Sequence, residues 1–299
     1  MPGTFTAVDL SRLPFPAVVD PLDFEVIFDA MKADFLLLAP QYSALLESDP
    51  GMKLLEVAAY RELMVRQRVN DAAKAVTLAY AVGSDLDHIA ARYNVERLLI
   101  TPADPAAFPP RDAVYESDAD LRRRVQLAFE GFSTAGPVGA YLFHTLSAHG
   151  QVLDASVYSP VPGDVVVSVL SRVGDGTADP DLLAAVNAAL SDEDVRPLTD
   201  QVFVQGAEIV PFAVEASLTL YPGPDAAVVL ADAVARLEAY VAENHRLGRD
   251  ITRAGLVAAL CTVGVQNVAL NLPPADIVIT PQQAPWCTGH AVVIGGYDE

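Results

Sequence analysis

Acidic side chains come nearest to a catalytic arrangement in this sequence. Hydrolysis of a glycosidic bond needs two carboxyl groups that face each other across a cleft, one as acid and the other as base or nucleophile. Glu56 and Glu62 lie six residues apart in a helix-forming stretch, so they point to different faces of that helix. Asp192 and Asp194 lie in a polar run typical of a turn. Because the chain has 39 acidic residues, such pairs arise by chance, and the sequence predicts no enzyme.

Metal and cofactor sites lack the residue spacing that they need. The five histidines are scattered, and neither Cys261 nor Cys287 belongs to a CxxC pair. The acidic loop 174–181, GDGTADPD, does not follow the order of a calcium loop, so a turn before a helix is the better interpretation. The phosphate-binding motifs GxGxxG and GxxxxGK[ST] and the catalytic motifs HExxH and GxSxG do not occur. The sequence therefore predicts no metal and no cofactor.

The charge of the chain excludes two classes of partner. The formal net charge is −20, and the one basic run is Arg122-Arg123-Arg124. Phosphate groups are bound by clustered Lys and Arg, so we expect no nucleic acid and no anionic membrane surface as partner, whereas a basic protein stays open. We find neither a secretory leader at the start nor an apolar run of about 18 residues that would span a membrane.

The first hundred residues combine an extended segment with helices. Residues 1–23 hold four prolines and the apolar side chains Leu10, Leu13 and Phe15, which predicts an extended docking arm; a mobile tail is the alternative. A helical region follows over 24–100. We predict one helix over 23–46 that breaks at Pro40, one from about 50 to about 82 with Asp49 as N-cap, and one that begins at Ser84.

The long predicted helix has two apolar faces. Positions 55, 58, 62, 65, 69, 72, 76 and 79 alternate in steps of three and four, and seven of these eight residues are apolar. This spacing is typical of a coiled-coil seam rich in small residues, and its one acid, Glu62, has Arg66 four residues on. A second stripe runs beside the seam, through Met52, Ala59, Leu63, Ala73 and Tyr80. Such a helix needs two neighbours, so either part of it faces another chain or it is an ordinary buried helix.

The rest of the chain alternates helices with strands. The proline-rich stretch 97–112 separates the helical region from two small α+β units, 111–205 and 206–299. The first unit begins with a helix from Ser117 to about Gly131 and holds a hairpin formed by VLDASVYS and DVVVSVLSRV. The second unit holds a long helix over 225–245, a short helix and the strand VQNVALNLP. The predicted fold class is therefore α+β, a helical N-terminal region followed by two small α+β units.

An ordered set of stretches resembles the baseplate assembly protein J family of contractile-tailed bacteriophages and phage-tail-like particles. The matching stretches are DLSRLPFP, ESDPGMKLLEVAAYRELMVRQRVNDAAKA, AVGSDLDHIAARYNVERL, ESDADLRRRVQLAFEGFSTAGPVGAY, PGDVVVSVLSRVGDG and VRPLTDQVFV. The resemblance implies a structural protein of the baseplate that forms wedges and the ring around the central hub, assembles in the host cytoplasm, and couples attachment to sheath contraction. It also implies two partners at the N-terminal helices, a second copy and a tail-protein-I-like protein, besides other baseplate and hub proteins, with the C-terminal domains linking neighbouring wedges.

The expected interface lies on the arm and on the long helix. From the apolar pattern we assign Leu10, Leu13, Phe15, Val65, Val69, Ala72 and Val76, and the resemblance adds Asp49, Leu55, Glu56, Ala59, Arg61, Glu62, Arg66, Asn70 and Asp71. Polar groups such as Asn70 and Asp71 in a seam can fix the register of a helical bundle; an exposed Asn-Asp pair is the alternative. Two other functions stay open, a tail-associated glycan or peptidoglycan hydrolase and a receptor-binding tip. A receptor-binding tip usually has long β-rich or repetitive segments, so the high helix content disfavours it.

Overall fold

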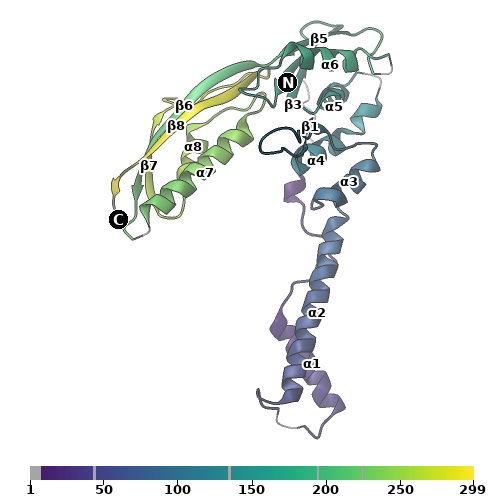
Figure 1. Cartoon of the computed structure of the whole chain (residues 1–299), viewed down its shortest axis with the longest axis vertical. Helices are drawn as coiled ribbons and strands as arrows, with labels where there is room; N and C mark the ends of the chain where they lie inside the picture. The colour runs from purple at the N-terminus through teal and green to yellow at the C-terminus, as the bar shows by residue number, and fades with distance from the viewer. Residues whose placement is uncertain (1–7, 43–44, 134–135, 194, 224) are drawn as a thin grey trace. The chain divides into compact units, whose positions relative to one another are not determined.

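The computed structural model describes residues 8–42, 45–133, 136–193, 195–223 and 225–299. The chain divides into two compact units, which we describe separately (Figure 1). The helical unit holds residues 8–96 together with Ser117–Val125, and the mixed unit holds Arg97–Glu116 together with 126–299. Residues 1–7 of the predicted docking arm lie outside the described residues, as do Asp194 of the acid pair and the remaining gaps in these ranges.

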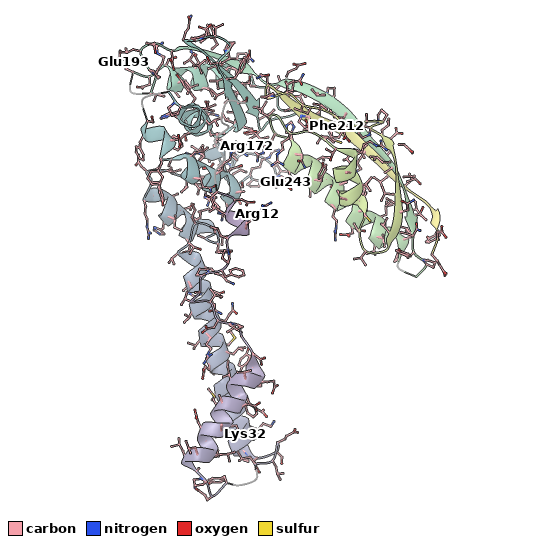
Figure 2. The ribbon with its side chains drawn as sticks, turned by 180° about the vertical axis from the view of Figure 1, so that it is seen from behind. Arg12, Lys32, Arg172, Glu193, Phe212 and Glu243 are labelled. Atoms are coloured by element: carbon pink, nitrogen blue, oxygen red, sulfur yellow. The ribbon has the colours of Figure 1, made fainter. Side chains whose placement is uncertain are left out.

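Two helices of the helical unit form an antiparallel pair. Helix α1 (Phe24–Leu38) begins at Asp23, whose carboxylate accepts hydrogen bonds from the backbone N–H groups of Glu25 and Val26 at 2.9 and 3.2 Å. Helix α2 (Pro50–Ala75) follows and packs against α1. In both views α1, which carries the labelled Lys32, lies beside the N-terminal half of α2 (Figures 1 and 2). The unit also contains the short 3-10 helix η1 (Leu10–Arg12), α3 (Gly83–Ala91) and the first part of α4 (Asp118–Leu127).

Two helix boundaries and one side-chain cap differ from the sequence-based expectation. Helix α2 ends at Ala75 rather than near 82, because the hydroxyl of Thr77 donates to the carbonyl of Lys74 at 2.8 Å and competes with the helical ladder. Asp49 precedes α2 but does not cap it, since its carboxylate accepts from Leu46 N–H at 2.8 Å. Helix α3 begins at Gly83, one residue before the predicted Ser84, and Gly83 has a φ of +54° that favours glycine.

The one basic run of the sequence is used inside the helical unit. The guanidinium of Arg122 donates to the carbonyls of Leu78 and Ala81 at 2.7 and 2.6 Å, so it holds the turn that links α2 to α3. Arg124 is buried and donates to the carbonyl of Glu96 at 3.0 Å. The planar donor fork of Arg122 reaches two carbonyls at once, so two arginines of this run have a structural use.

Replacing Arg122 with alanine should loosen this turn. Two charge-assisted hydrogen bonds are lost, and because the side chain is half-exposed we expect a cost of about 1–2 kcal/mol. Amide hydrogen exchange over residues 76–83 measures the change, which corresponds to roughly a tenfold loss of protection. Arg122→Lys is the control, since one ammonium cannot bridge both carbonyls with the same geometry and should recover only part of the protection. Unchanged exchange in Arg122→Ala would contradict the clamp.

The central part of the mixed unit is a three-stranded sheet with two helices. Its elements are β3 (Val152–Tyr158), β4 (Asp164–Ser171), β5 (Gln201–Gly206), α5 (Val138–Ala148) and α6 (Pro180–Leu190). Strands β3 and β4 pair antiparallel, which confirms the predicted hairpin, and β5 pairs parallel to β4. Asp179 caps α6 by accepting from Leu182 N–H at 2.7 Å, so the acidic loop leads into a helix as expected. The small sheet of β1 (Leu99–Thr101) and β2 (Val114–Tyr115) and the 3-10 helix η2 (Glu130–Phe132) precede this part.

The C-terminal part of the mixed unit has its own core. Strand β6 (Glu208–Leu220) lies between β7 (Val265–Leu272), antiparallel to it, and β8 (Gln283–Tyr297), parallel to it. Helices α7 (Ala226–Asn244) and α8 (Arg253–Leu260) cover one face through side chains such as Leu237 and Leu256, which are fully buried (Figure 1). Phe212 on β6 and Glu243 near the end of α7 mark one end of this part (Figure 2). N-terminal helices followed by small mixed sheets with helices confirm the predicted α+β class.

Candidate assembly interface

One side of α2 is covered by residues of the same chain. Met52, Ala59 and Asn70 are the buried residues of this helix, and Leu63 between them is half-buried. At 100° per residue these positions share one face. Ala59 is fully buried, and its small side chain allows α1 to approach closely. The second apolar stripe expected from the sequence therefore has its neighbour within the chain.

The N-terminal arm covers the same side of α2 farther along the helix. The ring of Phe15 lies 4.7 Å from that of Tyr80, and the ammonium of Lys74 lies 4.4 Å from the Phe15 centroid. The hydroxyl of Tyr80 donates to the carbonyl of Leu13. Leu13 and Phe15 still keep 42% and 57% of their surfaces exposed, so the described arm contacts its own helix and retains apolar surface for another partner.

Asn70 joins the arm to the helix. Its amide nitrogen donates to the backbone carbonyl of Asp20 at 2.8 Å, and its amide oxygen accepts from the backbone N–H of Asp20 at 3.1 Å. The side chain is only 4% exposed. It thus satisfies both backbone groups of one arm residue, in the way that a neighbouring strand would. Asn70 does not lie on the exposed seam, where a register-fixing role between chains had been predicted.

The opposite side of α2 is apolar and uncovered. Leu54, Val65, Val69 and Val76 are 71, 63, 51 and 69% exposed, and Ala58 and Ala72 between them are also exposed. We call these six residues the outer stripe. They recur at 54, 58, 65, 69, 72 and 76, so they follow one side of the helix and continue just past its end. Exposed apolar side chains gathered along one side of a helix are typical of an interaction site.

The remaining predicted interface residues are mostly polar, and they lie on α2, at its start or on the arm. Glu56 accepts from Lys53 at 2.8 Å, Glu62 accepts from Arg66 Nε at 2.9 Å, and Asp71 accepts from Gln67 at 2.7 Å. These pairs are exposed and stabilise the isolated helix only slightly. Arg61 is exposed, whereas Leu10, Asp49 and Leu55 are half-buried. Arg61 and Glu62 lie between Ala58 and Val65 on the same side of the helix, so the outer stripe is interrupted there by two charged side chains.

A shallow pocket beside α2 was not predicted from the sequence. Phe24 from α1 and Glu56, Val57, Tyr60 and Arg61 from α2 line it. The aromatic residues Phe24 and Tyr60 were the available signal, but their proximity depends on how α1 returns along α2. The pocket adds a second apolar feature to the exposed surface of the helical unit.

The shifted titratable groups do not form an acid pair. Burial and the hydrogen bond to Asp200 raise the pKa of Tyr141, and burial lowers the pKa of His144. Burial raises the pKa of the Cys287 thiol, and hydrogen bonds from Thr177 lower the pKa of Asp175. Both carboxylates of the Glu56 and Glu62 pair are engaged by basic neighbours on the helix surface. Within the described ranges no group of three metal-ligating side chains and no helix that could span a membrane is found.

Comparison with known proteins follows the same division of the chain. Models of the baseplate J-like N-terminal, central and C-terminal domains match residues 47–104, 133–206 and 212–292. Baseplate protein J of Escherichia phage P2 is 54% identical over 299 residues, which cover 98% of this chain and 99% of that protein. The chain belongs to the baseplate J family. A chain in the six-fold symmetrised cryo-EM structure of the anti-feeding prophage baseplate matches at 13% identity with a TM-score of 0.42, over 61% of this chain and 43% of that chain.

Membership in the baseplate J family fixes the general role of the protein. It is a structural component of the baseplate of a contractile phage or phage-like tail, and it is part of a multi-protein assembly. The family is structural rather than enzymatic, which removes the acid-pair hydrolase as an alternative.

Proposed function

We propose that this baseplate J protein forms the wedges of the baseplate through its helical unit and builds the ring around the central hub. The outer stripe of α2 is the observation that carries the proposal. Its larger side chains, Leu54, Val65, Val69 and Val76, are each at least half exposed, although their burial would be favourable. Fully burying one such side chain stabilises by about 1.5–3 kcal/mol, so a bundle that covers the stripe gains several kcal/mol against the cost of association.

The partners of the outer stripe are a second copy of this chain and a tail-protein-I-like protein. The small residues Ala58 and Ala72 alternate with the larger ones, which supports close packing of helices in a bundle. The net charge of −20 supports contact through a mainly apolar surface, because two copies repel each other elsewhere. The exposed parts of Leu13 and Phe15 offer a separate apolar surface on the arm, which lies on the other side of α2.

Each domain expected from the sequence has its own role in the proposed assembly. The arm, 1–23, and the helical region, 24–100, assemble the wedge, while the units 111–205 and 206–299 contact other baseplate and hub proteins and link neighbouring wedges. In this arrangement a change at the ring reaches every wedge, which is how we propose that attachment is coupled to contraction of the sheath. The separate hydrophobic cores over 127–204 and 212–294 support the last two units as independent contact modules.

Co-expression with the proteins encoded beside it tests the wedge. The chain is purified with whatever binds it, and light scattering gives the mass of the complex. A discrete complex with more than one copy of this chain beside a tail-protein-I-like partner is the expected result. A monomer that leaves every such neighbour unbound would overturn the proposal.

A further inference from the structure

The longest strand of the chain has one unpaired edge. Strand β8 has 15 residues, whereas strands usually have about five or six. In the order β7-β6-β8 it is an edge strand, so only one of its sides pairs with β6. The loop after α7 covers the start of this edge, since Gly248 N–H donates to the Gln283 carbonyl at 3.0 Å and the His245 ring contacts the Pro285 carbonyl at 2.7 Å. Beyond Pro285 the described residues place no other strand along it.

The uncovered part of β8 is regular and uncharged. Its pairing with β6 has register shifts at Cys287–Gly289 and at Ile294–Gly296, so Gly289–Ile294 is an unbroken run of six residues. The sequence from Thr288 to Tyr297, TGHAVVIGGY, contains no Lys, Arg, Asp, Glu or Pro. Natural proteins usually protect an exposed edge with charges, prolines or short strands. Gly289–Ile294 holds no Lys, Arg, Asp, Glu or Pro, and the irregular pairing at its two ends confines the open edge to these six residues.

The other edge of the same sheet is protected. Strand β7 has eight residues, and two prolines, Pro273 and Pro274, follow it directly. Arg253 donates to the carbonyls of Leu270 and Pro273, so a charged side chain occupies the end of this edge. Because the β7 edge of the same sheet is protected, the open edge is specific to β8 and not common to the whole sheet.

We infer that β8 pairs edge to edge with β8 of a second copy, forming a continuous sheet of six strands. This inference rests on the proposed link between neighbouring wedges and names the strand that makes it. A two-fold axis through the run places each copy antiparallel to the other, so the same residues serve both sides. The absence of charge favours a second copy, because two chains of charge −20 approach most easily along an uncharged edge. Backbone hydrogen bonds supply the affinity, as in other cases of strand addition.

Two lysines on the open face of β8 test the pairing. Ala291 and Val293 are both exposed, and Val292 and Ile294 on the other face pack against the core, so Ala291→Lys with Val293→Lys should leave the fold intact. Antiparallel pairing would gather four lysines on one face, and like charges opposite each other are destabilising. The matched control places Ala269→Lys with Asn271→Lys at exposed positions of β7, at the other edge of the sheet. Circular dichroism checks that all variants stay folded.

The measurement is the mass of the full chain by light scattering, with and without Val69→Asp in the outer stripe. With two interfaces, the wild-type chain grows beyond a dimer, each single disruption gives a dimer, and the combination gives a monomer. The β7 control should behave as wild type. Amide exchange over Gly289–Ile294 in the Val69→Asp chain should slow by at least tenfold as concentration rises.

The failures of the two proposals are distinguishable. If Val69→Asp is a monomer without the β8 lysines, the C-terminal part makes no link between copies and the inference is overturned. If Val69→Asp stays a dimer with and without the lysines, the copies are linked by another surface, and the inference is overturned while the link stands. If the β8 lysines alone give a monomer, β8 is supported and self-association through the outer stripe is not.

Discussion

Val69→Asp is expected to abolish wedge formation while both parts of the mixed unit stay folded. Val69 lies at the centre of the outer stripe and is half exposed in the chain alone, so a carboxylate at this position is solvated and costs the monomer little. In a bundle the same carboxylate would be buried without a partner, which costs at least several kcal/mol. At 1.4 kcal/mol for each tenfold change, affinity should fall by a thousandfold or more. Light scattering of the co-expressed complex measures the loss.

Arg68→Asp is the matched control for this substitution. It lies one residue earlier, points about 100° away around the helix, and is exposed. It changes the charge by two units rather than one, so an effect of charge alone would be larger in the control. Wedges that assemble normally with Val69→Asp would show that the outer stripe is not the contact.

The apolar period of α2 predicts the side of the helix that holds the exposed apolar residues. Val65, Val69, Ala72 and Val76 were placed on a seam, and all four are exposed in the chain. The pattern did not reveal that Leu54, and not Leu55, continues the line, because a straight helix drifts from a repeat of three and four residues. It also did not reveal which stripe the chain itself covers, since that depends on where α1 and the arm return along α2.

Strand β8 could not be predicted from the local sequence pattern. The stretch TGHAVVIGGY contains three glycines and no clear alternation of apolar and polar residues, so local pattern alone did not indicate a strand. Its pairing with β6 joins residues about 75 positions apart, and parallel partners at that distance leave no turn signal between them. The hairpin of β3 and β4 was predicted because its two strands are adjacent in the sequence and joined by a proline-glycine turn.

Asn70→Asp is expected to release the arm from α2. The substitution keeps an acceptor for the N–H of Asp20 but replaces the donor with a carboxylate oxygen facing the Asp20 carbonyl. Because position 70 is buried, the lost hydrogen bond and the unfavourable pair of oxygens together cost about 2–3 kcal/mol. Amide exchange of residues 13–20 in the isolated chain should lose protection by roughly 30- to 150-fold.

The same experiment decides between a contact within the chain and a contact between chains at Asn70. Asp71→Ala is the control, since its carboxylate is exposed and accepts only from the neighbouring Gln67 in this helix. If Asn70 holds the arm of its own chain, Asn70→Asp frees the arm, and amide exchange over residues 13–20 rises in the monomer before any partner is added. If Asn70 instead fixes the register of the bundle, exchange in the monomer stays unchanged and the mass of the complex falls. The two hydrogen bonds to Asp20 and the 4% exposure of Asn70 favour the first result.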